Sequence, residues 1–262
     1  MSRIGSILIC LALVIPFSAL AETVRVGGYR FPPFVILEKG EHTGLTVDVI
    51  AALNEIQDQH EFKFFHTSSK RRYHDHDQGL YDVILFEDPR WEWADRPVSR
   101  TRVIARDEEV FVAHSERADG EAFFRNLEDR RLVGMLGYHY QFADYVADEG
   151  FLDTQFNILL SSSLERNLQL ILLNRPSVAE VAIVPRSFLN LYFHRRPEAR
   201  NLVKVSERVD QVYELRALVR KGSPISAEAL DQLLGELEES GRLPELRSKY
   251  HLPPLEGARP ES

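Results

Sequence analysis

The sequence predicts an α/β protein built as two lobes, and three observations lead to that prediction. Stretches with strand character alternate along the chain with stretches of helical spacing, which is typical of α/β sheets. The alternation comes in two successive sets of about 100 residues, each large enough for its own folding unit. The composition, 44% hydrophobic and 27% charged, is that of a globular protein.

Strands are expected where short apolar or alternating runs occur. We expect them at 24–26, 61–66, 81–86, 109–113, 132–135, 156–160, 178–184, 202–205 and 213–219. Because helical segments separate most of them, the sheets should be parallel. The turn at 31–34 contains Pro32 and Pro33, which cannot donate to a strand ladder, so no regular structure is expected there.

Helices are expected where apolar residues recur every three or four positions. The expected helices are 44–57, 141–148, 164–172, 186–193, 227–240 and 243–250. Ser163 and Ser226 can cap the helices that follow them, and Gly241 suits the end of the second one. No flexible linker separates the two sets, so short direct crossings should join the lobes.

The first 21 residues have the pattern of a secretory signal peptide. Arg3 is followed by an apolar run, and Ala19 and Ala21 provide the small residues of a cleavage site. We expect cleavage after Ala21 and a periplasmic protein. The only cysteine, Cys10, lies in this segment, so the mature chain contains no thiol.

Charge excludes one class of partner. The chain has 32 Lys+Arg and 40 Asp+Glu, a net charge of -8, and losing Arg3 takes it to -9. Nucleic-acid binding needs a basic face, so no nucleic-acid partner is expected.

Six motifs in order resemble the family 3 extracellular solute-binding proteins, best known as receptors of polar amino-acid ABC importers. They are Pro32–Phe34, Gly44–Val49, Gly79–Ile84, Leu127–Gly137, Leu215–Gly222 and Gly241–Tyr250. The resemblance covers about residues 24 to 252. It implies a type II periplasmic-binding fold, in which two crossing strands join the lobes and the cleft closes on a ligand by hinge bending.

The resemblance also implies lobe boundaries and partners. Lobe 1 would comprise 22–106 and the returning segment 213–252, lobe 2 would comprise 107–212, and 253–262 would be a tail. The expected partners are a small-molecule ligand and an inner-membrane ABC permease or a sensor. We expect a monomer without a cofactor.

The sequence departs from the family at the two positions that hold an α-amino acid. The slot of the carboxylate-binding arginine falls on Trp91, with Arg90 one residue early. The slot of the ammonium-binding aspartate falls near Pro185 and Arg186. The expected ligand is therefore a small polar or amine-containing, amino-acid-like solute, and these departures leave open whether it is an ordinary α-amino acid.

Ligands of α/β proteins sit beyond the carboxyl ends of strands. Those ends, with the arginines near the family's cleft positions, give these candidate ligand-binding residues: Tyr29, Phe34, Arg72, Phe86, Glu87, Arg90, Trp91, Gly137, Tyr138, His139, Ser162 and Arg186. Aromatic faces could enclose a flat or cationic ligand, and Glu87 or Asp88 could neutralise an amine. Alternatively, Phe34 and Phe86 are core, Trp91 and Trp93 fix a surface loop, and Arg72 lies on a solvated face.

The sequence contains few motifs that indicate catalysis or metal binding. No nucleophile elbow, zinc-protease motif or phosphate loop is present. The run 73–77, with two His and two Asp, is interpreted as a polar helix surface, because positions i and i+2 do not share a helix face. A dehydratase-like enzyme using Glu87, Asp88 or His139 is one alternative function. A degenerate subunit that binds only a partner is another.

Overall fold

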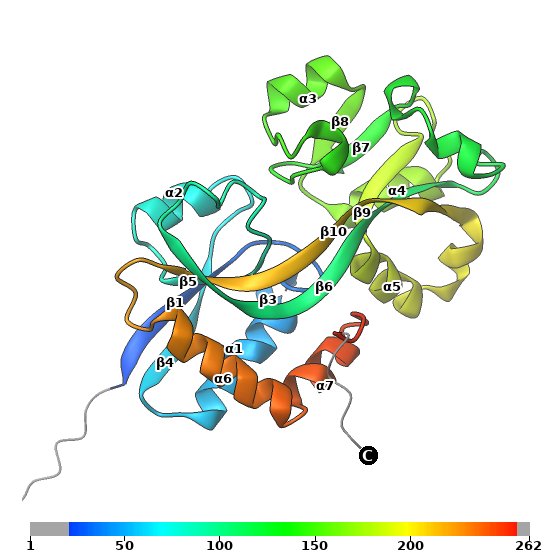
Figure 1. The fold of residues 1–262 in the computed structure, drawn as a ribbon. Helices are drawn as coiled ribbons and strands as arrows, with labels where there is room; N and C mark the ends of the chain where they lie inside the picture. Colours follow the sequence, from blue (N-terminus) through cyan, green and yellow to red (C-terminus); the bar gives the residue numbers. More distant parts are fainter. Residues whose placement is uncertain (1–20, 256–262) are drawn as a thin grey trace, which may run out of the picture.

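The computed structural model describes residues 21–255 and has two α/β lobes joined by a pair of long strands (Figure 1). The strands are β1 (Glu22–Gly28), β2 (Ile36–Glu38), β3 (Glu41–Thr43), β4 (His60–His66), β5 (Val83–Glu87), β6 (Val98–His114), β7 (Leu132–Met135), β8 (Ile158–Ser161), β9 (Val181–Pro185) and β10 (Val203–Arg220). The helices are α1 (Leu45–Ile56), α2 (Arg72–Asp77), α3 (Glu149–Gln155), α4 (Leu164–Leu172), α5 (Arg186–Arg195), α6 (Ala227–Glu239) and α7 (Arg242–Lys249).

One hydrogen-bonded sheet runs through both lobes in the order β4-β1-β5-β10-β6-β9-β7-β8. Within each lobe the strands are parallel, as predicted: β1 pairs with β4 and β5, and β7 pairs with β8 and β9. The crossing strands β6 and β10 are antiparallel to each other and to their neighbours β9 and β5. The prediction of parallel sheets is therefore correct for the lobes and wrong for the crossing.

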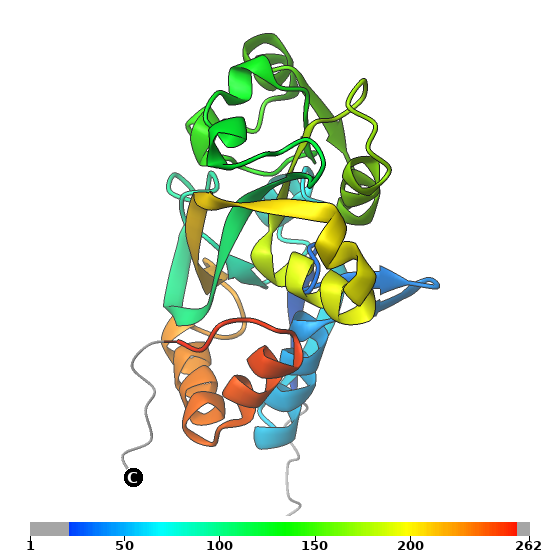
Figure 2. The same cartoon turned by 90° about the vertical axis from the view of Figure 1, so that its right-hand side faces the viewer.

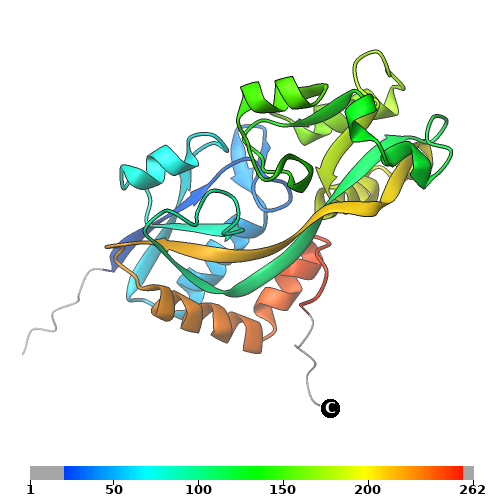
Figure 3. The same cartoon turned by 45° about the horizontal axis from the view of Figure 1, so that its top comes forward.

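The crossing strands are much longer than the sequence predicted. The expected strand 109–113 is the end of β6, and the expected strands 202–205 and 213–219 are parts of the single strand β10. Charged residues interrupt the apolar pattern because one face of this ribbon is exposed, at Glu207, Arg208, Val212 and Glu214. Figure 3 shows the two strands running from one lobe to the other. The predicted lobe boundaries at 106/107 and 212/213 both fall inside these strands.

The register of this pair is regular in its middle and at its two ends, and irregular in two stretches between them. Residues 211–215 of β10 pair without a shift with 105–109 of β6. The register shifts on one side between Val205 and Gln211, and on the other between Leu215 and Leu218. Such irregularities bend and twist a strand locally.

Three helices, α1, α6 and α7, contact one another beneath the sheet of the first lobe (Figure 2). Both predicted serine caps are present: the Ser163 hydroxyl accepts from Arg166 N at 3.3 Å, and the Ser226 hydroxyl from Ala229 N at 3.1 Å. These local signals placed α4 and α6 within one residue of their ends.

The predicted helix 141–148 is wrong. Only a single 3-10 turn, Gln141–Ala143, forms there. Asp144 and Tyr145 adopt left-handed backbone angles, with φ of 51° and 61°, which ends any helix. Asp148 instead caps α3 by accepting from Phe151 N at 2.8 Å.

The predicted signal peptide lies outside the described residues, apart from Ala21, as does most of the predicted tail. Between residues 21 and 255, no helix has the length and apolar character needed to cross a bilayer.

Candidate functional site

A small cavity lies between the lobes at the crossing strands. It is lined by Tyr29, Phe31, Arg72, Trp91, Glu109, Tyr138, His139, Gln211 and Tyr213. Its free volume is about 10 Å³, which is room for one water molecule. The lining residues come from both lobes and from both crossing strands, so the cavity can exist in this form only while the lobes are together.

Arg72 and Glu87 form a buried ion pair on the first-lobe side. Their side chains are 1% and 0% exposed, and Arg72 Nε lies 3.3 Å from Glu87 Oε2. The guanidinium also donates to the carbonyl oxygens of Ser69 and, at 3.3 Å, of Gly137. Trp93 Nε1 donates to Glu87 Oε2 at 2.6 Å. Burial raises the pKa of Glu87, and the Arg72 charge opposes that shift. With Glu87 ionised, the pair adds no net charge to the cleft.

Tyr73 and His139 connect the two lobes next to this pair. The Tyr73 hydroxyl accepts from Arg72 Nη2 at 2.6 Å and lies 2.8 Å from His139 Nε2. His139 Nδ1 lies 2.7 Å from the Tyr145 carbonyl oxygen, to which it can only donate, so Nε2 is an acceptor when the ring is neutral. The single proton of the Tyr73 hydroxyl then has two acceptors within reach, His139 Nε2 and the Trp91 carbonyl oxygen at 2.7 Å. Burial and the nearby Arg72 charge lower the pKa of His139 to about 4, which keeps the ring neutral.

The crossing strands place three polar side chains on the cavity. Glu109 is paired with Gln211 across the ladder, and Tyr213 follows two residues later on the same face. Gln211 is fully engaged: it donates to the His139 carbonyl oxygen and accepts from Trp91 Nε1 at 3.3 Å. By contrast, Glu109 Oε1 and the Tyr213 hydroxyl are buried without a hydrogen-bond partner within residues 21–255.

Two further buried carboxyl groups lie near Glu109, but both have partners. Asp107 accepts from the Ser187 hydroxyl and from Ser187 N at 3.1 Å. Asp210 accepts from the backbone N–H groups of Gln141 and Phe142 at 2.8 and 2.9 Å. Burial, with help from the Asp210 and Asp107 charges, raises the pKa of Glu109 well above its ordinary value.

Aromatic rings form most of the remaining wall. The Phe31 ring lies edge-on to Tyr138 and Trp91, at centroid distances of 5.5 and 6.0 Å. The Trp91 ring is in turn edge-on to Tyr213 at 5.1 Å. An aromatic cleft was predicted from the sequence, although through a partly different set of residues.

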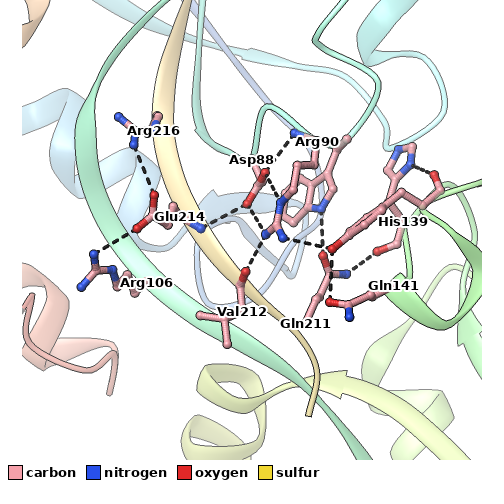
Figure 4. Close-up of polar contacts among 11 residues, drawn as sticks. Asp88, Arg90, Arg106, His139, Gln141, Gln211, Val212, Glu214 and Arg216 are labelled. Carbon is pink, nitrogen blue, oxygen red and sulfur yellow. Dashed lines mark hydrogen bonds and ion pairs between the residues drawn. The ribbon is translucent and has the colours of Figure 1, made fainter.

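Arg90, one of the candidate ligand-binding arginines, is engaged elsewhere. It pairs with Asp88 at 2.7 Å and donates to the Val212 carbonyl oxygen at 2.5 Å and to the Tyr145 hydroxyl at 3.0 Å. Asp88 also accepts from Glu214 N at 3.1 Å. As Figure 4 shows, this network fastens the loop after β5 to the crossing strand β10. Neither group is free for a ligand.

The structure thus distributes the predicted site residues unevenly. Tyr29, Arg72, Trp91, Tyr138 and His139 line the cavity. Phe34 and Phe86 pack against each other in the core, with ring centroids 4.8 Å apart, and Glu87 and Gly137 contact Arg72. Ser162 lies at the rim near Arg30, and Arg186 pairs with Glu108 outside the cavity.

One of the alternative interpretations is wrong, and another is correct only in part. Arg72 is 1% exposed, so it does not lie on a solvated face. Trp91 and Trp93 are buried, at 5% and 1% exposed, in the loop after β5, so their burial does not exclude that they fix this loop. The segment 73–77 lies largely on α2, but Asp75 and His76 are buried, and Asp75 accepts from the Thr67 hydroxyl at 2.6 Å. A polar helix surface therefore describes only part of this segment.

Sequence reasoning missed five residues of the site: Phe31, Tyr73, Glu109, Gln211 and Tyr213. A signal for three of them was present. Tyr213 lies between the exposed residues Val212 and Glu214, and Glu109 and Gln211 each have one exposed or half-exposed neighbour, Glu108 and Val212. Because side chains alternate between the two faces of a strand, Gln211 and Tyr213 would have been predicted on one face, with Glu109 opposite Gln211, if the crossing strands had been predicted at their full length.

Direct contacts hold the lobes together around the cavity. Arg30 pairs with Glu165 at 2.7 Å, and the Ser69 hydroxyl donates to the Leu136 carbonyl oxygen at 2.7 Å. Gly137 has φ of +72°, and a side-chain carbon there would come within 3.1 Å of Ser69 and Lys70. The lobes therefore meet closely enough to require a glycine.

Within residues 21–255, no group of three or more His, Cys, Asp or Glu side chains is placed to hold a metal ion.

The fold is shared with several solved structures. A histidine kinase sensor domain with similarity to periplasmic binding proteins has a TM-score of 0.69 at 18% identity, over 90% of this chain and 99% of that one. The substrate-binding protein of an amino acid ABC transporter has a TM-score of 0.64 at 15% identity, over 87% and 99%. An ancestral amino-acid-binding protein, a precursor of cyclohexadienyl dehydratase, has a TM-score of 0.66 at 20% identity, over 87% and 94%.

At these identities the similarities establish the fold alone. No curated protein matches the chain in sequence. Residues 24–253 match the bacterial extracellular solute-binding proteins, family 3, almost the range over which the motifs resembled that family. The protein has the type II periplasmic-binding fold and belongs to family 3 of the bacterial extracellular solute-binding proteins.

Proposed function

We propose that this protein captures a small amine-containing solute in the cleft between its lobes and that the lobes close over it by hinge bending. The observation that carries the proposal is the pair of buried, unpartnered polar atoms, Glu109 Oε1 and the Tyr213 hydroxyl, on the inter-lobe cavity. Leaving such groups unpaired costs about 1–3 kcal/mol each. A ligand that bonds both of them removes that cost only when the lobes are together.

The same proposal includes a periplasmic location and delivery of the solute to an inner-membrane ABC permease or to a sensor. Membership of a family of extracellular solute-binding proteins supports it. So does the shared fold of a kinase sensor domain and of an ABC transporter's substrate-binding protein.

An enzymatic function receives no comparable support. The candidate acid–base groups are held in place by other residues: Glu87 by Arg72 and Trp93, and Asp88 by Arg90. His139 is fixed as a neutral ring between Tyr73 and Tyr145. We therefore propose binding, not turnover.

The test is a ligand screen on the mature chain, 22–262, against amines, amino acids and organic acids. Binding should raise the melting temperature and change tryptophan fluorescence, because Trp91 lines the cavity. X-ray scattering should show a smaller radius of gyration with ligand.

Tyr138→Ala should abolish the ligand-induced shift. Tyr250→Ala is the matched control, since Tyr250 is 8% exposed, against 7% for Tyr138, but lies at the end of α7 away from the cavity. A folded protein that no member of the panel stabilises would overturn the proposal in favour of a subunit that binds only a partner.

A further inference from the structure

Within residues 21–255, Glu109 Oε1 and Glu87 Oε1 are both buried without a hydrogen-bond partner, but Glu87 is held through its other oxygen by Arg72 and Trp93, and Glu109 makes no such contact. Glu109 is 1% exposed, and its neighbours Asp107 and Asp210 each accept hydrogen bonds from a backbone N–H or a hydroxyl. Those partners stabilise the two neighbouring carboxylates but do not reach Glu109. A buried carboxylate without a partner is costly, so this position is poorly explained by folding alone.

The cavity wall has one carboxyl group, that of Glu109, that no basic side chain of the wall is left to neutralise. Arg72 is the only Lys or Arg among the lining residues, and its charge is matched by Glu87 at 3.3 Å. The remaining ionisable acid of the wall is Glu109. Burial favours the neutral acid at Glu109 while the cavity is empty, and a bound ammonium favours the carboxylate, so that the ligand's positive charge and the Glu109 charge neutralise each other.

A zwitterionic amino acid would not neutralise the Glu109 charge. Its carboxylate would need a second, free cation, and the nearby arginines are engaged. Arg72 donates through its two Nη atoms to Tyr73 and two carbonyl oxygens, and its Nε, which makes no hydrogen bond within the described residues, faces Glu87 at 3.3 Å. Arg90 is turned toward Asp88. A ligand carboxylate in this cleft would have to compete with those bonds.

The other walls also suit a cation. The rings of Phe31, Trp91, Tyr138 and Tyr213 surround the cavity, and aromatic faces attract ammonium groups. The Tyr213 hydroxyl has no partner and can accept a hydrogen bond. Two acceptors, Glu109 and Tyr213, favour an ammonium that carries N–H donors over a quaternary one.

From this geometry we infer that the ligand is a small primary or secondary amine without a carboxylate, whose ammonium is bound between Glu109, the Tyr213 hydroxyl and the surrounding aromatic rings. The inference rests on the proposed function, because it assumes that the cleft binds a solute. The small closed cavity further requires a compact ligand, for which the lobes need to separate only slightly.

The experiment compares probes of matched size by titration calorimetry on the mature chain. The probes are ethylammonium, tetramethylammonium, alanine and propionate, all at the same ionic strength. Ethylammonium should bind at least about tenfold more tightly than each of the others.

Glu109→Gln should weaken ethylammonium binding at least about tenfold, and Tyr213→Phe should weaken it by a smaller factor. Asp107→Asn is the matched control. It removes a carboxylate two residues away on the same strand face, one that is already hydrogen-bonded, and should change the affinity less than about threefold. Circular dichroism checks that each variant is folded.

The outcomes separate this inference from the proposed function. Tight binding of alanine, or ethylammonium binding that Glu109→Gln leaves unchanged, would overturn the amine assignment while leaving solute capture intact. If none of these probes binds but another panel member does, the amine assignment falls alone. If nothing in the wider panel binds, both fall.

Discussion

Two carboxylates in the same cleft have opposite surroundings. Glu87 is 0% exposed and Glu109 is 1% exposed, so burial does not distinguish them. Glu87 faces Arg72 and accepts from Trp93 through Oε2, whereas Glu109 has no hydrogen-bond partner among the residues that the structure describes. The comparison teaches that a buried charge with a partner stabilises the fold, whereas a buried charge without one indicates where a ligand is needed to complete the site.

The largest expected effect comes from removing the paired carboxylate. Glu87→Gln leaves Arg72 as a buried, unneutralised cation, and this should lower the free energy of unfolding by about 3 kcal/mol. Glu109→Gln should instead leave stability unchanged or raise it at pH 8, because it removes a carboxylate whose pKa is raised in the folded protein. Urea unfolding of both variants checks this. Equal losses of unfolding free energy in the two variants would contradict the difference proposed between the two sites.

Acid should weaken the partnered side of the cleft through His139. Unfolded, its pKa is near 6.5, and in the folded protein it is about 4. The unfolded chain therefore binds more protons between these values, so the stability contribution is complete above pH 6.5 and falls as the pH drops to 4, by about 3 kcal/mol. His139→Gln should flatten this part of the pH profile of unfolding. An unchanged profile would mean that the ring is already exposed.

Two tyrosines allow the same comparison with neutral groups. The Tyr73 hydroxyl contacts Arg72, His139 and the Trp91 carbonyl oxygen, so Tyr73→Phe should cost about 1–2 kcal/mol. The Tyr213 hydroxyl has no partner within residues 21–255, so Tyr213→Phe should leave stability unchanged or raise it by up to about 1–3 kcal/mol. Thermal unfolding of the ligand-free variants measures both. A loss of stability for Tyr213→Phe would reveal a partner for its hydroxyl.

The smallest effect is expected at an exposed ion pair between the lobes. Arg195 Nη1 lies 2.6 Å from Glu38 Oε1, but the two side chains are 53% and 55% exposed. Glu38→Gln should change the free energy of unfolding by less than about 0.5 kcal/mol, and the change should shrink further in 1 M salt. A loss comparable to that of Glu87→Gln would show that distance, and not burial, sets the value of these pairs.

Local signals predicted the fold better than they predicted the site. The serines that begin α4 and α6 act within one turn, so the sequence was sufficient for them. The crossing strands were underestimated because their middle is polar, and the cavity is built where that middle passes between the lobes. Glu109 could not be distinguished from a surface carboxylate, since its burial depends on aromatic residues distant in sequence.

The regular ladder between 105–109 and 211–215 has a mechanical consequence. It lies between two irregular stretches of β10, where the register shifts. When the strands bend at these irregular stretches, Glu109, Gln211 and Tyr213 keep their positions relative to one another while each lobe rotates. Substitutions at 206–208 would then change how easily the lobes separate without changing which ligand they bind. Substitutions on the cavity face of the ladder would change the ligand specificity without restricting the hinge motion.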